Sequence, residues 1–130
     1  MTVSSAASVS LDPPLLLFCV HADARLRDAL EEVDTWTLSV LAAGQGAVAD
    51  WLASAGRPAV DQLARVPHHD PVAAAGVRID GAAAWFDCRT AAVHPAGDHD
   101  IVVGEVLAAQ RGGPGSGGLV HLEGRLRDVR

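Results

Sequence analysis

Two adjacent prolines, Pro13 and Pro14, divide the start of the chain into two unlike segments. Proline has no backbone N–H and a fixed φ, so neither a helix nor a regular ladder of sheet hydrogen bonds continues through this pair. Residues 2–11 are rich in Ser and Thr, whereas residues 15–20 are continuously apolar. The sequence therefore predicts two extended segments joined by a turn, as a β-hairpin or a β-arch.

The hydroxyl side chains of the first segment recur with the period of a β-strand. The positions of Ser4, Ser8 and Ser10 differ by four and by two, so a regular strand places all three side chains on one face. A row of small hydroxyls suits a strand that lies against a polar ligand. An exposed edge strand that carries Ser for solubility explains the same spacing, so the pattern leaves both interpretations open.

Length and charge narrow the class of protein. A chain of 130 residues is the size of one domain. It contains no apolar run near the ~20 residues of a membrane helix and no opening segment of the signal-peptide kind, so we expect a cytoplasmic protein. The formal charge of −6, without a basic cluster in the sequence, predicts no nucleic-acid partner and no membrane partner.

The spacing of cysteine and histidine gives no metal motif. Cys19 and Cys88 are far apart and have no CxxC companion, so we expect two free thiols rather than a disulfide or a zinc site. His68, His69 and Asp70 are adjacent in a predicted loop, where three neighbouring side chains cannot all point at one ion. The sequence predicts no metal site.

Apolar periodicity and turn residues predict the other elements. The expected helices are 25–33, 45–53 and a short piece at 58–64. The expected strands are 36–41, 82–93, 99–109 and 119–122, with loops at 68–76 and 111–118. The three tryptophans, Trp36, Trp51 and Trp85, are expected in the core. Short strands around a few helices predict a mainly β protein, a closed or nearly closed antiparallel barrel.

Several segments, in the same order, match one known family. The most specific are Ser-Val-Ser-Leu-Asp-Pro-Pro at 8–14 and Pro-Ala-Gly-Asp-His at 95–99. By these motifs the chain resembles the flavin reductase-like domain family, the short-chain NAD(P)H:flavin oxidoreductases. The resemblance implies an FMN-binding split barrel, a Greek-key antiparallel β-barrel with short helices, over residues 1–130. It also implies that the family's usual N-terminal helix and first strand are lacking.

The resemblance implies an activity as well. Members of the family reduce FMN or FAD with NADH or NADPH by hydride transfer, supply the reduced flavin to a partner monooxygenase, and form homodimers. Two alternatives with the same fold stay open. One is a flavin-binding carrier or electron-transfer protein with little turnover, and the other is a flavin-free truncated remnant.

The resemblance assigns roles to residues at matching positions. His99, in the Gly-Asp-His turn, is the candidate catalytic residue, because the family places this histidine near the nicotinamide. Arg25 is a candidate partner for the flavin phosphate, although an Arg at a helix start is also commonly solvated. His21 is expected to border the ligand because its strand ends there. The other candidate flavin contacts are Thr2, Val3, Ser4, Ser5 and Ser8.

Overall fold

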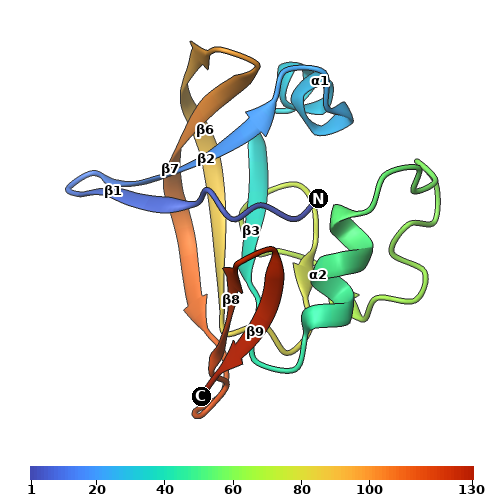
Figure 1. Cartoon of the computed structure of the whole chain (residues 1–130). Coiled ribbons are helices and arrows are strands. Elements are labelled where there is room, and N and C mark those ends of the chain that lie inside the picture. The colour runs from blue at the N-terminus through green and yellow to red at the C-terminus, as the bar shows by residue number, and fades with distance from the viewer.

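The computed structural model describes all residues from 1 to 130. Its centre is one antiparallel sheet of five strands in the order β1-β2-β7-β6-β3 (Figure 1). The strands are β1 (Ala7–Leu11), β2 (Pro14–His21), β3 (Thr35–Val40), β6 (Ala84–Ala96) and β7 (His99–Arg111). This confirms the mainly β antiparallel architecture predicted from the sequence.

Smaller elements surround this sheet. They are helices α1 (Arg25–Glu32) and α2 (Gly46–Ala53), the pair β4 (His68–His69) and β5 (Arg78–Ile79), and the pair β8 (Gly118–Leu122) and β9 (Arg125–Val129). In Figure 1, α1 lies at the end of the sheet where β6 turns into β7, and α2 and the β8–β9 hairpin lie toward the other end. Neither helix is both long enough and apolar enough to cross a membrane.

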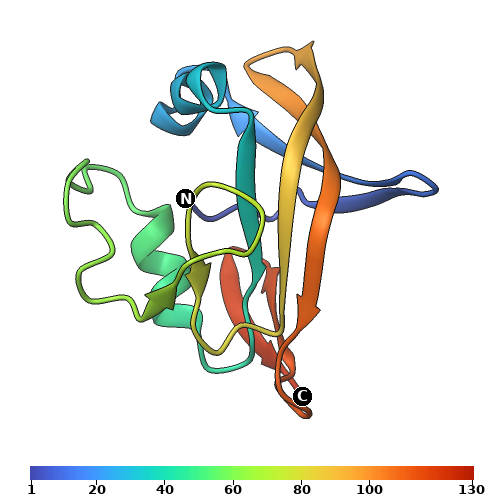
Figure 2. The ribbon, with the colours of Figure 1, turned by 180° about the vertical axis from the view of Figure 1, so that it is seen from behind.

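The hairpin of β6 and β7 runs along the whole sheet (Figure 2). Only Gly97 and Asp98 connect the two strands, and Gly97 has a φ of 69°, which glycine adopts without steric cost. On its other edge β7 pairs with β2, and this ladder ends with His21 opposite His99. Because β7 has a partner strand on each side, its register places both neighbours.

The main core lies on one face of the sheet. Side chains alternate along β2, so Leu16, Phe18 and Val20 are buried. Phe18 meets Trp36 of β3 edge to face, with ring centroids 4.8 Å apart. Gly104 of β7 makes room for this ring, because a Cβ atom there would lie 2.4 Å from Cζ2 of Trp36. Close packing therefore requires a glycine at this point of the strand.

The predicted hairpin around the two prolines forms, but its first strand is shorter and less regular than expected. β1 begins at Ala7, and residues 2–6 are not a strand. A bulge between Ser8 and Ser10 shifts the pairing, so that Ser8 lies opposite Leu16 and Ser10 opposite Leu15. The prediction that Ser8 and Ser10 share a face is therefore wrong, since the bulge reverses the alternation between them.

Most other elements follow the prediction, but residues 68–69 of the predicted loop form β4, and β5 and β9 were not expected. The helices at 25–33 and 45–53 and the four later strands are confirmed to within three residues at each boundary. The helical piece predicted at 58–64 is wrong, because this segment consists of turns and bends. Trp36 and Trp85 are buried as expected, but Trp51 is 42% exposed, with its indole N–H donating to the Gln62 carbonyl at 2.7 Å. That bond holds the irregular segment against α2.

A buried ion pair attaches the segment between β4 and β5 to the sheet. The Nε and Nη2 atoms of Arg78 donate to the two carboxylate oxygens of Asp87 at 3.1 and 2.9 Å. Asp87 also accepts hydrogen bonds from the backbone N–H groups of Val72 and Ala73, each at 2.9 Å. Burial alone would raise the pKa of Asp87, but Arg78 and the two backbone donors outweigh it and lower that pKa.

We expect Asp87→Asn to lower the free energy of unfolding at neutral pH by about 3 to 5 kcal/mol, because the Arg78 charge then stays buried without a partner. Urea unfolding followed by tryptophan fluorescence measures this. The folded-state pKa of Asp87 lies below its unfolded value, so its stabilising effect is complete above about pH 5 and disappears as the pH falls through the folded pKa.

Asp70→Asn is the matched control, since Asp70 is exposed and forms no ion pair. Its effect should stay within about 0.5 kcal/mol. Equal stabilities for the two variants, or an unchanged acid limb in Asp87→Asn, would contradict the role of the buried pair.

Candidate functional site

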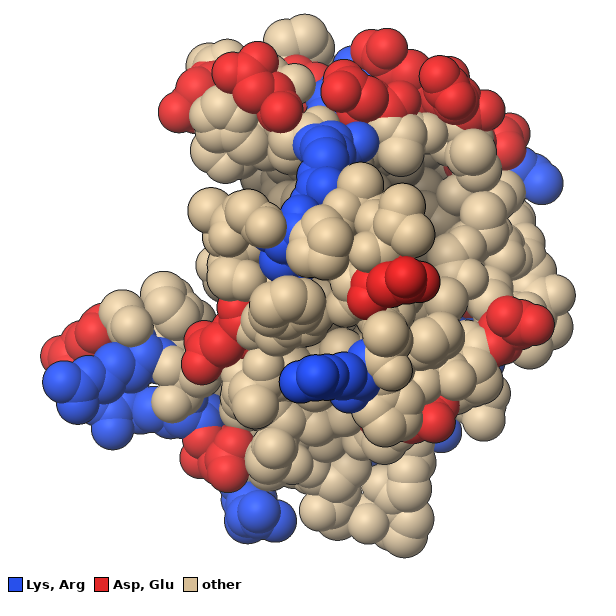
Figure 3. Space-filling model, turned by 90° about the vertical axis from the view of Figure 1, so that its right-hand side faces the viewer, with Lys and Arg blue, Asp and Glu red and all other residues tan.

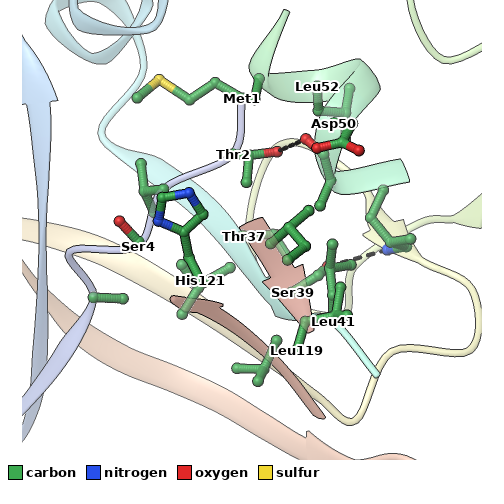
Figure 4. Close-up of a pocket in the computed structure, with 18 of the residues that line it drawn as sticks. Met1, Thr2, Ser4, Thr37, Ser39, Leu41, Asp50, Leu52, Leu119 and His121 are labelled. Carbon is green, nitrogen blue, oxygen red and sulfur yellow. Dashed lines mark hydrogen bonds between the residues drawn. The ribbon is translucent and has the colours of Figure 1, made fainter. Parts of the chain in front are cut away.

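An apolar cavity of about 770 Å³ opens between the N-terminal segment and the edge strand β3. Its walls are residues 1–4 and Ala6, β3, the inner side of α2 and the β8–β9 hairpin (Figure 4). Most of the lining side chains are apolar, among them Leu38, Leu41, Leu52, Ile79 and Leu119. This volume lies in the range of roughly 300 to 1,000 Å³ typical of sites for small ligands and cofactors.

Most hydroxyl groups in the cavity are used by the protein itself. Thr2 donates its hydroxyl to the Ala49 carbonyl of α2 at 2.7 Å, and the Ser39 hydroxyl accepts the backbone N–H of Ile79 at 3.1 Å. These bonds fix the walls rather than offering contacts to a ligand.

Three polar side chains that line the cavity form no hydrogen bond within the chain: Ser4, Asp50 and His121. They come from the N-terminal segment, α2 and β8 respectively, so they stand on different walls (Figure 4). An apolar cavity with a few free polar groups is the usual chemistry of a cofactor site.

The N-terminal segment also leads to the end of the sheet where two histidines meet. The Ser5 hydroxyl accepts the backbone N–H of Cys19 at 3.1 Å, which ties this segment to β2. Two residues further along β2 is His21, and His21 is the register partner of His99 on β7. Ser5, His21 and His99 therefore lie on three neighbouring segments at one end of the sheet.

The two imidazole rings are held by different partners. Their centroids are 5.2 Å apart, edge to face. His21 accepts the backbone N–H of Asp23 on Nδ1 at 3.1 Å, so a neutral His21 carries its proton on Nε2. Nδ1 of His99 lies 2.7 Å from Oδ1 of Asp98, and the hydrogen bond and charge of His99 lower the pKa of that carboxyl. An ionised Asp98 only accepts, so Nδ1 of His99 carries the proton.

Arg25 stands at the first position of α1, just beyond the loop that follows His21. Its Nη2 donates to the backbone carbonyl of Arg57 at 3.0 Å, which places two guanidinium-bearing residues side by side. Arg57 lies in the segment after α2, and its Nε donates to the Gln62 side chain, which lines the cavity. Arg57 is therefore joined to the cavity wall through Gln62, and Arg25 is joined to Arg57, although neither arginine lines the cavity itself.

The residues selected from the sequence thus separate into groups. Thr2, Val3 and Ser4 line the cavity. Ser5, His21 and His99 meet at the end of the sheet, and Arg25 lies beyond them. Ser8 is exposed on β1 and joins neither group.

Sequence reasoning missed Asp50, His121 and Arg57. None of them lies in a recognisable motif, and each reaches the site through contacts between segments far apart in the chain. For His121 the only signal was a predicted strand, which carries no information about the cavity that it faces.

Comparison with known proteins agrees with this architecture. The family model described as "Flavin reductase like domain" matches residues 1–130. The chain is 39% identical over 128 residues to the "NADH-dependent FAD reductase" of Streptomyces globisporus, covering 98% of this chain and 70% of the relative. It is 43% identical over 114 residues to the "FMN reductase (NADH) SmoA" of Agrobacterium fabrum, covering 87% and 63%.

A solved structure shares the fold. BorF, the flavin reductase component of a bacterial two-component tryptophan halogenase, superposes with a TM-score of 0.92 at 40% identity, over 99% of this chain and 81% of that one. The match confirms the split-barrel fold of flavin reductases. Four curated relatives are longer, since the chain spans between 57% and 70% of their lengths. With a family match over its whole length, the chain belongs to the flavin reductase-like domain family.

Proposed function

We propose that this protein reduces FMN or FAD with NADH and supplies the reduced flavin to a partner oxygenase. The observation that carries the proposal is the match of all 130 residues to the family, together with about 40% identity to two proteins named as NADH-dependent flavin reductases. The partner is inferred from BorF, which serves a two-component halogenase. NADH is a reductant of the cytoplasm, so we infer that location.

The site offers what a flavin needs. Flavin, when bound, supplies the ring system that accepts a hydride from the nicotinamide. The apolar walls suit the face of the flavin ring system, and the free hydroxyl of Ser4 offers a hydrogen bond to a polar ring edge. We propose that the segment Thr2–Ser5 holds the ring end and that Arg25 holds the phosphate end.

His99 is proposed as the residue on the nicotinamide side. Its Nδ1 is bonded to Asp98, so its Nε2 is the ring nitrogen left for a ligand. Hydride transfer depends mainly on close, parallel rings, and a positioned hydrogen bond supplies that orientation without requiring His99 to act as an acid or base. His21 contacts the ring of His99 and restricts its orientation.

The first test is an assay of NADH and NADPH oxidation with added FMN, FAD or no flavin. We expect flavin-dependent oxidation with NADH preferred over NADPH, because both named relatives use NADH. Loss of nucleotide absorbance under anaerobic conditions measures it. Flavin binding without turnover would support the carrier alternative, and absence of both binding and turnover would support the flavin-free remnant.

The second test separates His99 from the flavin contacts. We expect His99→Ala to lower kcat/KM for NADH by about 5- to 150-fold, the loss of one positioned hydrogen bond worth about 1 to 3 kcal/mol, with little change in flavin affinity. Ser4→Ala should weaken flavin binding instead. Steady-state kinetics at saturating flavin and fluorescence titration give the two quantities.

His94→Ala is the control for this test, because His94 is exposed on the same hairpin without a hydrogen bond to its ring. If His99→Ala folds and keeps its kcat/KM, His99 is a turn residue only.

We also propose that the protein is a homodimer. The sheet face opposite the core carries Leu17 beside Val103 and Cys19 beside Ile101, all half-buried and apolar, whereas a solvated face is usually polar. β1 leaves a sheet edge with Leu11 90% exposed. Light scattering should give twice the chain mass of 13.4 kDa, and a monomer mass at every concentration would refute the dimer.

A further inference from the structure

Arg25 and Arg57 are two positive side chains that lie together without a negative partner. Every basic residue among the ten of this chain is an arginine. Arg27, Arg78 and Arg89 form ion pairs with carboxylates, whereas Arg25 and Arg57 form none. The protein carries a net charge of −6, so carboxylates are abundant. The pair therefore forms a local positive site on an acidic molecule.

Figure 3 shows this contrast on one face of the molecule. Acidic side chains gather at the top, the end where α1 lies in Figure 1, and a short run of basic side chains lies directly beneath them. Burial and the charges of Arg57 and Arg25 also lower the pKa of the Met1 amino group, which agrees with a positive potential at this point.

The hydrogen bonds around Arg57 fix its direction and leave donors free. Its Nη1 donates to the Ser54 carbonyl at 2.6 Å and its Nε to the Gln62 amide oxygen at 3.3 Å. Arg25 uses one Nη2 donor on the Arg57 carbonyl. Since each guanidinium has five N–H donors, most donors of the pair stay available. The Arg25 side chain is bonded to the backbone of Arg57, and the free N–H donors of two such neighbouring arginines match the oxygens of a phosphate.

We propose that Arg57, together with Arg25, binds the phosphate of the flavin and so makes the protein prefer FMN and FAD over riboflavin. The proposal rests on the proposed function and adds a residue from the segment after α2, far in sequence from the N-terminal contacts. Gln62 connects Arg57 to the cavity wall, so the phosphate lies beside the cavity and not inside its apolar part. The pyrophosphate of NADH has the same chemistry, and the test must separate the two sources.

The test compares the wild type with Arg57→Gln by fluorescence titration of FMN and riboflavin and by titration of NADH without flavin. We expect FMN affinity to fall by about 10- to 150-fold, the loss of a charge-assisted hydrogen bond, while riboflavin affinity stays unchanged. Arg65→Gln is the matched control, because Arg65 is exposed on the same segment and has no ion pair. It should leave FMN binding unchanged.

Arg57→Lys, with thermal melts of all variants, addresses the structural bonds of Arg57. It keeps the charge and loses the planar fork, so we expect partial recovery of FMN affinity. Equal losses of FMN and riboflavin affinity in a folded Arg57→Gln protein, or no loss of FMN affinity, would overturn the proposal. Loss of NADH affinity alone would assign the arginines to the nucleotide and would also overturn it.

A final measurement does not depend on flavin. Pyrophosphate at constant ionic strength should raise the thermal midpoint of the wild type and of Arg65→Gln more than that of Arg57→Gln. If the wild type binds no flavin, the proposed function fails, and this measurement still decides whether an anion site exists. Equal shifts in all three proteins would refute the site.

Discussion

The register of β7 between β2 and β6 is the constraint on which the other features depend. It pairs His21 of β2 with His99. On the other edge of β7 it pairs Gly104 with Thr90 of β6. Gly104 leaves the space that the Trp36 ring fills, so the Trp36 side chain of β3 can pack into the core. A shift of one residue would turn the core residues of β7 to solvent and would separate the two histidines. The same pairing therefore determines both core packing and site geometry.

The buried pair of Arg78 and Asp87 extends this order to the irregular segment before β6. Two charges removed from water are costly, and here a bidentate contact with two backbone donors offsets that cost. The pair positions the strand that ends at Ile79, a residue that lines the cavity. A buried polar interaction outside the cavity lining thus shapes one wall of the site.

Much of the fold could be predicted from the sequence because its signals are local. Proline pairs, alternation and the Gly-Asp turn placed the main hairpins, and motif resemblance selected His99 as a candidate. The bulge could not be predicted, since it arises where Ser8 and Ser10 of β1 pair with the adjacent residues Leu16 and Leu15 of β2. Trp51 has an apolar ring, yet its N–H required a partner, and the carbonyl of Gln62 held it near the surface. Both features depend on contacts between separate segments of the chain, which a local sequence pattern does not specify.

The charge distribution bears on how anionic ligands reach such a site. Flavin phosphates and NADH are negative, and a protein with a net charge of −6 does not attract them over long distances. At physiological ionic strength, however, screening limits exposed charges to about 8 Å, so an anion near Arg25 and Arg57 responds mainly to those two side chains. Arginine suits this task better than lysine, because a guanidinium that donates to the protein through one edge still presents another edge to a ligand. We therefore expect the local arrangement of donors, rather than the total charge, to govern anion binding on this surface.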